Sequence, residues 1–168
     1  MMRLDHIGIA VSDADRAKQF YSGALALRMA SDETWQYKDT RFRWTCFDYR
    51  QEAFRMHAPP EELRFGVRLE LMSSPDPSAF TNLFIARRGE GLHHLTFEVE
   101  EIDEAVESLR SSGVAVREVE TGDPTWKIAL VEPDEALGML VILAQYQEDF
   151  WIYPSREGPV LQNLYGAT

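Results

Sequence analysis

Large apolar residues occupy every second position in two stretches of the chain, 4–11 and 94–99. A period of two is typical of a strand with one buried face. Each stretch is followed by apolar residues at helical spacing, which predicts helices over 12–25 and 101–112. In the first of these, Ser12 with Asp15 three residues later forms a capping-box pattern, so Ser12 is expected to cap that helix.

Three more strand-like stretches follow each predicted helix. They are 29–37, 42–49 and 64–72 in the first half, and 114–119, 126–131 and 138–145 in the second. The order of elements is therefore βαβββ, repeated once in tandem. A chain that mixes strands and helices in this order is predicted to adopt an α+β fold.

Helix signals also lie between the two repeats. Asp76 is placed as an N-cap, Pro77 as the first helical residue, and Arg87, Arg88 and Gly89 as a C-terminal signal. We therefore expect a first module over 1–75, a linking helix over 76–90, a second module over 91–146 and a C-terminal tail over 147–168. The two modules are expected to form one domain.

Strand parity predicts which side chains share a surface. His6 and His94 fall on the face opposite to the apolar residues that should meet the helices. The last strand of the first module places Arg68, Glu70 and Met72 on that same face. A charge in the middle of an apolar strand is costly unless it is paired or coordinated, so Glu70 is a candidate ligand.

Composition limits the possible partners. The 168 residues include 17 Lys and Arg against 28 Asp and Glu, which gives a net charge of −11 at pH 7 and disfavours binding to nucleic acid or an anionic membrane. The charged start of the chain is unlike a signal peptide, and no uncharged run is long enough to span a bilayer. The lone Cys46 cannot form an intrachain disulfide. We therefore expect a cytoplasmic protein with neither nucleic acid nor membrane as a partner.

Three segments resemble a known family: LDHIGIAV at 4–11, RFGVRLEL at 64–71 and RGEGLHHLTFEV at 88–99. With its βαβββ repeat, the chain resembles the vicinal oxygen chelate superfamily over residues 3–146. This superfamily includes glyoxalase I, methylmalonyl-CoA epimerase, extradiol dioxygenases and metal-free bleomycin-resistance proteins, and segment 88–99 is most similar to the epimerase branch. The resemblance implies that the repeats form a curved mixed sheet enclosing a cavity for metal and substrate.

The resemblance also implies a metal site. In metal-binding members the first and fifth strands each supply a histidine, and the fourth and eighth each supply a carboxylate or amide. His6, His94 and Glu70 stand at three of these places, and Ile142 stands at the fourth. Both faces of the predicted eighth strand are apolar, so parity alone leaves open which face carries Ile142. Imidazole and carboxylate without thiolate suit one divalent ion of Fe, Mn, Co, Ni or Zn. Arg68, Met72 and Ile142 are expected on the cavity wall.

The expected function is that of a metal-dependent lyase or isomerase, like glyoxalase or the epimerase, which acts next to a carbonyl of a metal-chelated small molecule. The first alternative is a ring-cleaving dioxygenase, because two histidines and one glutamate resemble the ligand set of non-heme iron oxygenases. The second alternative is a metal-free binding or resistance protein. No catalytic residue is assigned, because Ile142 replaces the usual carboxylate; Asp48 and Glu52 are candidates for a base by their approximate location alone.

Two further expectations concern packing. His93 belongs with the helix-side residues, so it is interpreted as a structural histidine. A homodimer is expected, because exposed sheet edges, the aromatic-rich stretch 34–63 and the apolar tail all need covering. The stretch 34–63 is interpreted either as ordinary strand core with a subunit contact or as a wall of the substrate pocket.

Overall fold

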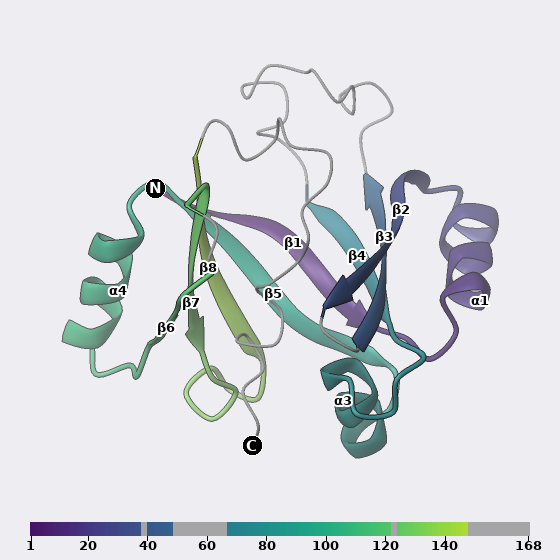
Figure 1. The fold of residues 1–168 in the computed structure, drawn as a ribbon. Coiled ribbons are helices and arrows are strands. Elements are labelled where there is room, and N and C mark those ends of the chain that lie inside the picture. The colour runs from purple at the N-terminus through teal and green to yellow at the C-terminus, as the bar shows by residue number, and fades with distance from the viewer. Residues whose placement is uncertain (38–39, 49–66, 122–123, 148–168) are drawn as a thin grey trace. The chain divides into compact units, whose positions relative to one another are not determined.

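The computed structural model describes residues 1–37, 40–48, 67–121 and 124–147 (Figure 1). Glu52 and the tail from residue 148 onward lie outside the described residues, so the predictions made for them stay predictions. Within the described parts, no helix is both long and apolar enough to cross a membrane.

The described strands form a mixed eight-stranded sheet in the order β2-β3-β4-β1-β5-β8-β7-β6. Their bounds are β1 (Met2–Ala10), β2 (Arg28–Tyr37), β3 (Thr40–Asp48), β4 (Arg68–Ser73), β5 (Gly91–Val99), β6 (Arg117–Val119), β7 (Trp126–Val131) and β8 (Leu140–Tyr146). The helices are α1 (Ala14–Lys18), the π-helical turn η1 (Gln19–Ala24), α3 (Phe80–Arg88) and α4 (Ile102–Ser111). The predicted α+β fold with two similar halves is thereby confirmed.

The chain divides into two compact units. The first unit is His6–His93, and the second unit contains Met1–Asp5 together with the chain from His94 onward. Strands β1 and β5 therefore each begin in one unit and end in the other.

Strand register shows the repeat at the level of single residues. In the first unit β1 and β4 are parallel, with Gly8 opposite Glu70. In the second unit β5 and β8 are parallel, with Thr96 opposite Ile142. His6 lies two positions before Gly8 on β1, and His94 lies two positions before Thr96 on β5. Ile142 therefore occupies in the second unit the position that Glu70 occupies in the first.

The first unit buries its apolar strand face against α1 and η1. Val11, Phe47 and Leu71 form a buried cluster onto which Ala17 and Tyr21 of these helices pack. Figure 1 shows α1 beside β3 and β4. Burying one such large apolar side chain contributes about 1.5–3 kcal/mol, so this cluster fixes which face of the strands is left for His6 and Glu70.

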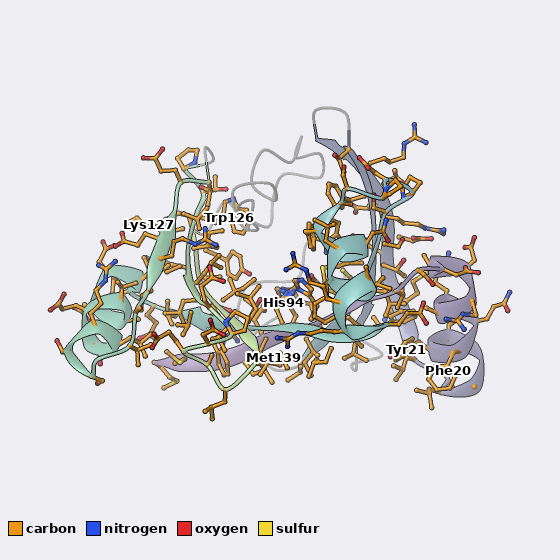
Figure 2. The ribbon with its side chains drawn as sticks, turned by 90° about the horizontal axis from the view of Figure 1, so that it is seen from below. Phe20, Tyr21, His94, Trp126, Lys127 and Met139 are labelled. Atoms are coloured by element: carbon orange, nitrogen blue, oxygen red, sulfur yellow. The ribbon has the colours of Figure 1, made fainter. Side chains whose placement is uncertain are left out.

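The second unit has apolar clusters on both faces of its sheet. Leu143 packs with Val99 and Val106 against α4, whereas Ile142 packs with Leu130 and Leu140 on the opposite face. Strand β7 shows the same alternation, because Lys127 contacts Asp103 of α4 at 3.0 Å while Trp126 packs with the Ile142 cluster (Figure 2). The structure thus decides the question that parity left open, since Ile142 points away from α4.

The helix starts differ from the sequence prediction. Helix α1 is capped by Asp13, whose Oδ1 accepts a hydrogen bond from the Arg16 backbone N–H at 2.9 Å, and not by Ser12. The Ser12 backbone N–H instead donates to Glu90 Oε1 at 2.8 Å. The prediction was wrong because Ser12 is hydrogen-bonded to Glu90, which is distant in the sequence, so Asp13 caps the helix in its place.

The linking helix α3 begins at Phe80, three residues later than Pro77. Asp76 does not cap this helix, because its Oδ1 accepts from the Ser78 backbone N–H at 2.8 Å and from the Ser78 hydroxyl at 2.7 Å. An aspartate bonded to the backbone two residues on is typical of a turn. The two hydrogen bonds therefore hold residues 76–79 in a turn ahead of the helix.

Candidate metal centre

His6 and Glu70 approach each other on the sheet face opposite to the helix-packed core of the first unit. His6 is buried on β1, Glu70 lies on the adjacent parallel strand β4, and the distance from His6 Nε2 to Glu70 Oε2 is 3.4 Å. Their side chains are only 11% and 13% exposed, respectively. An imidazole nitrogen and a carboxylate oxygen thus lie close together in a largely water-excluded environment.

The carboxylate of Glu70 has two further neighbours, both on β3. The indole Nε1 of Trp44 donates a hydrogen bond to Oε2 at 3.3 Å, and the thiol of Cys46 donates to Oε1 at 3.8 Å. Cys46 is directly opposite Glu70 in the antiparallel β3–β4 pair. Sequence reasoning missed both contacts; the spacing of two puts Trp44 and Cys46 on one face, but it does not give the register of β3 against β4.

Cys46 lies in an environment that disfavours its thiolate. Burial raises the pKa of Cys46 to about 12, and the negative charge of Glu70 acts in the same direction. The residue is therefore a neutral thiol at pH 7, able to donate a hydrogen bond.

Arg68 and Met72 flank Glu70 on β4 at two positions to either side, so strand alternation puts all three on one face. Met72 is fully buried opposite Trp44, and Arg68 is half-buried opposite His6. Ile142, the third residue expected on the cavity wall, is buried in the second unit. Asp48, a candidate base, is the last residue of β3.

His94 and His93 have different surroundings although they are adjacent. His94, labelled in Figure 2, is buried at the start of the second unit and lies opposite Leu140 of β8. His93 packs against α3, with ring centroids 5.4 Å from Phe80 and 4.7 Å from Phe84. Burial lowers the pKa of His93 to about 4, so its ring is neutral at pH 7 and packs as a largely apolar group, as interpreted from the sequence.

The first-unit pair fits a divalent ion. Two ligand atoms about 2.1 Å from one ion, at a tetrahedral angle, are about 3.4 Å apart, which matches the distance between His6 Nε2 and Glu70 Oε2. The same distance is longer than the usual N–H···O hydrogen bond of about 2.9 Å. An imidazole nitrogen with a carboxylate oxygen suits borderline divalent ions.

Comparison with known proteins identifies the family. Residues 5–130 match the family described as the Glyoxalase/Bleomycin resistance protein/Dioxygenase superfamily. The chain belongs to this superfamily. The resemblance noted in the sequence is thereby confirmed, and members of this vicinal oxygen chelate superfamily often bind a divalent metal. The matched region contains His6, Glu70 and His94, whereas Ile142 lies beyond its end.

Individual relatives agree with the superfamily assignment. An uncharacterized protein of Bacillus subtilis, YqjC, is 30% identical over 151 residues, which cover 89% of this chain and 96% of YqjC. The crystal structure of the hypothetical protein BH1468 from Bacillus halodurans C-125 is 25% identical with a TM-score of 0.65, covering 87% of this chain and 95% of that one.

Epimerases are among the structural neighbours. The methylmalonyl-CoA epimerase from Mycobacterium tuberculosis is 27% identical with a TM-score of 0.62, covering 85% of this chain and 87% of that one. Members and structural neighbours of the superfamily are mostly enzymes. The epimerase is a protein to which this chain is similar, and the similarity leaves the reaction of this chain open.

Proposed function

We propose that His6, Glu70 and His94 hold one divalent metal ion, and that the protein is a metal-dependent lyase or isomerase acting next to a carbonyl of a small chelating molecule. The observation that carries this proposal is the approach of His6 Nε2 to Glu70 Oε2 at 3.4 Å inside a largely buried environment. Among the described His, Cys, Asp and Glu residues, these three form a group that could hold a metal ion. Membership of a superfamily that often binds metal supports the same conclusion.

Each ligand has a defined task in this proposal. Bound there, a divalent ion would polarise two oxygens of the substrate and stabilise negative charge next to the carbonyl. His6 must present Nε2 without a proton and Glu70 must present a carboxylate, so acid should weaken binding. The low exposure of both side chains excludes most water, which strengthens electrostatic interactions at the site.

Ile142 limits how a proton can be moved. At the position equivalent to Glu70, its side chain has no group that accepts a proton, and it is buried with Leu130 and Leu140. A base for proton abstraction must therefore come from another residue of the chain or from the substrate. In this proposal Arg68, Met72 and Ile142 remain the residues expected to line the cavity wall, and Met72 and Ile142 are its apolar members.

Ile142 also favours a second candidate, a non-heme iron dioxygenase. Two histidines and one carboxylate leave several coordination positions open, which such oxygenases use for oxygen and a chelating substrate. A carboxylate at residue 142 would occupy one of those positions, whereas an isoleucine leaves it accessible. The ligand set is the same in both candidates, so the reaction has to be separated by experiment.

The metal site is tested by elemental analysis and Co²⁺ titration. We expect one ion per chain in the wild type and loss of tight binding in Glu70→Ala and His94→Ala. Glu98→Ala is a matched control, because Glu98 is a carboxylate of β5 that pairs with Arg3 and has no part in the proposed site. Unchanged affinity in Glu70→Ala and His94→Ala would refute the ligand assignment.

The reaction is tested by two assays on the metal-loaded protein. Deuterium exchange from solvent into a methylmalonyl-type thioester would support the lyase or isomerase, and oxygen uptake with a catechol in the presence of ferrous iron would support the dioxygenase. If neither deuterium exchange nor oxygen uptake occurs and the metal-free protein still binds small apolar molecules, a metal-free binding protein is the better account.

A further inference from the structure

The two oxygens of the Glu70 carboxylate have different partners on β3. Oε2 accepts from the Trp44 indole at 3.3 Å and lies 3.4 Å from His6 Nε2. Oε1 accepts from the Cys46 thiol at 3.8 Å. Of the two oxygens, Oε2 is therefore the one that lies next to the proposed metal ligand His6, and Oε1 is held on the side of Cys46.

The backbone of β3 fixes both donors at the carboxylate. Cys46 lies opposite Glu70 and Trp44 opposite Met72, so the two donors project from one strand face. Thr45, between them, projects to the other face and donates to Asp32 at 2.8 Å. Strand alternation thus places Trp44 and Cys46, which donate to Glu70, on one face of β3 and Thr45, which donates to Asp32, on the other.

Packing restricts the Trp44 ring. Its ring centroid is 5.8 Å from that of Phe42 and 6.3 Å from that of Phe80, and Phe42 is fully buried. An aromatic side chain that packs against two other rings has little rotamer freedom to lose when it donates a hydrogen bond. The indole N–H is therefore a rigid donor whose position does not depend on a bound ion.

We propose that Trp44 and Cys46 are positioning residues that hold the Glu70 carboxylate so that Oε2 alone faces the ion and Oε1 is kept away from it. This inference rests on the proposed metal site. A carboxylate that donates one oxygen occupies one coordination position, and a freely rotating carboxylate could occupy two. The β3 pair thereby keeps a position accessible for the substrate. Partners of this kind typically change metal affinity by about 10–100-fold when removed.

The first test uses the metal-free protein, so it does not depend on metal binding. In ¹⁵N-labelled protein the Trp44 indole resonance is identified by its absence in Trp44→Phe. In Glu70→Ala this resonance should shift upfield in the proton dimension and its hydrogen should exchange faster with solvent, because the acceptor is gone. Glu98→Ala should leave the resonance unchanged. An identical resonance and exchange rate in Glu70→Ala would overturn the inference.

The second test measures the affinity and visible spectrum of bound Co²⁺. Cys46→Ala should reduce the visible absorption, because the freed Oε1 can then bind cobalt and the absorption falls as cobalt gains ligands. Cys46→Ser keeps a donor and should therefore retain the wild-type spectrum. Trp44→Phe should weaken binding by about tenfold or more. Thr45→Val is the matched control. It removes a hydrogen-bond donor of the same strand that donates to Asp32 and not to Glu70, so it should leave cobalt binding unchanged.

The outcomes separate the inference from the proposed function. If the wild type binds no cobalt, the metal site fails, and the indole resonance still decides whether Trp44 holds Glu70. If the wild type binds cobalt while Cys46→Ala and Trp44→Phe match it in affinity and spectrum, the metal site stands and the positioning role is refuted.

Discussion

At the scale of single residues, the two halves of the molecule differ most at Glu70 and Ile142. Both face away from the helix-packed core of their unit. Glu70 lies opposite Gly8, two positions after His6, and Ile142 lies opposite Thr96, two positions after His94. Glu70 has a histidine, an indole and a thiol around its carboxylate, whereas Ile142 has only apolar neighbours in its cluster. The same strand position thus carries a carboxylate in one unit and an apolar side chain in the other.

Ile142→Glu tests this asymmetry. The new carboxylate would stand at the position equivalent to Glu70, so we expect tighter Co²⁺ binding if the longer polar side chain fits, together with some loss of stability from the buried charge. For the dioxygenase candidate, oxygen uptake should fall because an open position is filled; for the lyase or isomerase, exchange into the thioester should rise. Leu143→Glu, on the α4 side, should be strongly destabilising. Cobalt affinity equal to that of the wild type in folded Ile142→Glu would show that residue 142 does not face the site.

At the scale of elements, alternation made the strands predictable and long-range contacts decided the rest. Strand β7 has the bounds expected from its pattern, and Glu70 lies on the expected face. The cap of α1 could not be predicted, because Ser12 is satisfied by Glu90, a residue far away in the sequence. The same holds for Trp44 and Cys46, whose role depends on the register between β3 and β4.

A charged network shows how α1 is attached to the sheet. Asp32 on β2 accepts from the Arg43 guanidinium at 2.9 and 2.8 Å and from Thr45 at 2.8 Å, and it also pairs with Lys18 of α1. The Arg43 hydrogen bonds hold the pKa of Asp32 far below its usual range, although burial opposes this shift. The carboxylate therefore connects α1, β2 and β3.

Asp32→Asn should destabilise the protein at pH 7 by about 2–3 kcal/mol, because two partly buried cations, Arg43 and Lys18, lose the largely buried carboxylate between them and, among the described residues, keep only the exposed Asp15. A carboxyl group whose pKa is lowered on folding stabilises above its unfolded pKa, and this contribution is lost as the pH falls. The difference between wild type and Asp32→Asn, measured by urea unfolding, should therefore shrink progressively below about pH 4. Glu118→Gln, which breaks an exposed pair with Arg110, should change stability by less than about 1 kcal/mol. A wild-type advantage that stays constant down to pH 2 would contradict this account.

At the scale of the whole molecule, a tandem repeat accounts for both the fold and the site. Each unit has a parallel strand pair extended by antiparallel strands, β4-β3-β2 in one and β8-β7-β6 in the other. Repetition brings a histidine to equivalent positions of β1 and β5, and Ile142 stands in the second unit where the first has Glu70. The superfamily could be predicted from this repeat, whereas the reaction could not, because one scaffold supports several chemistries.

We propose that the protein is a homodimer. Strands β2 and β6 are at the two ends of the described sheet, and unpaired strand edges are usually covered. Large apolar side chains such as Phe20, Leu25 and Met29 are also exposed in the first unit. Light scattering at micromolar concentration should give twice the chain mass of 19.3 kDa. A single species at the chain mass would contradict the proposal.

The most direct test of the account is an anomalous diffraction experiment on crystals loaded with Co²⁺, with data collected on both sides of the cobalt absorption edge. The account predicts one anomalous peak per chain, within bonding distance of His6 Nε2, a Glu70 oxygen and a His94 ring nitrogen, and no such peak in crystals of Glu70→Ala. A peak bound by other residues, or none at these three in a fully loaded crystal, would contradict the central claim that they form a metal centre.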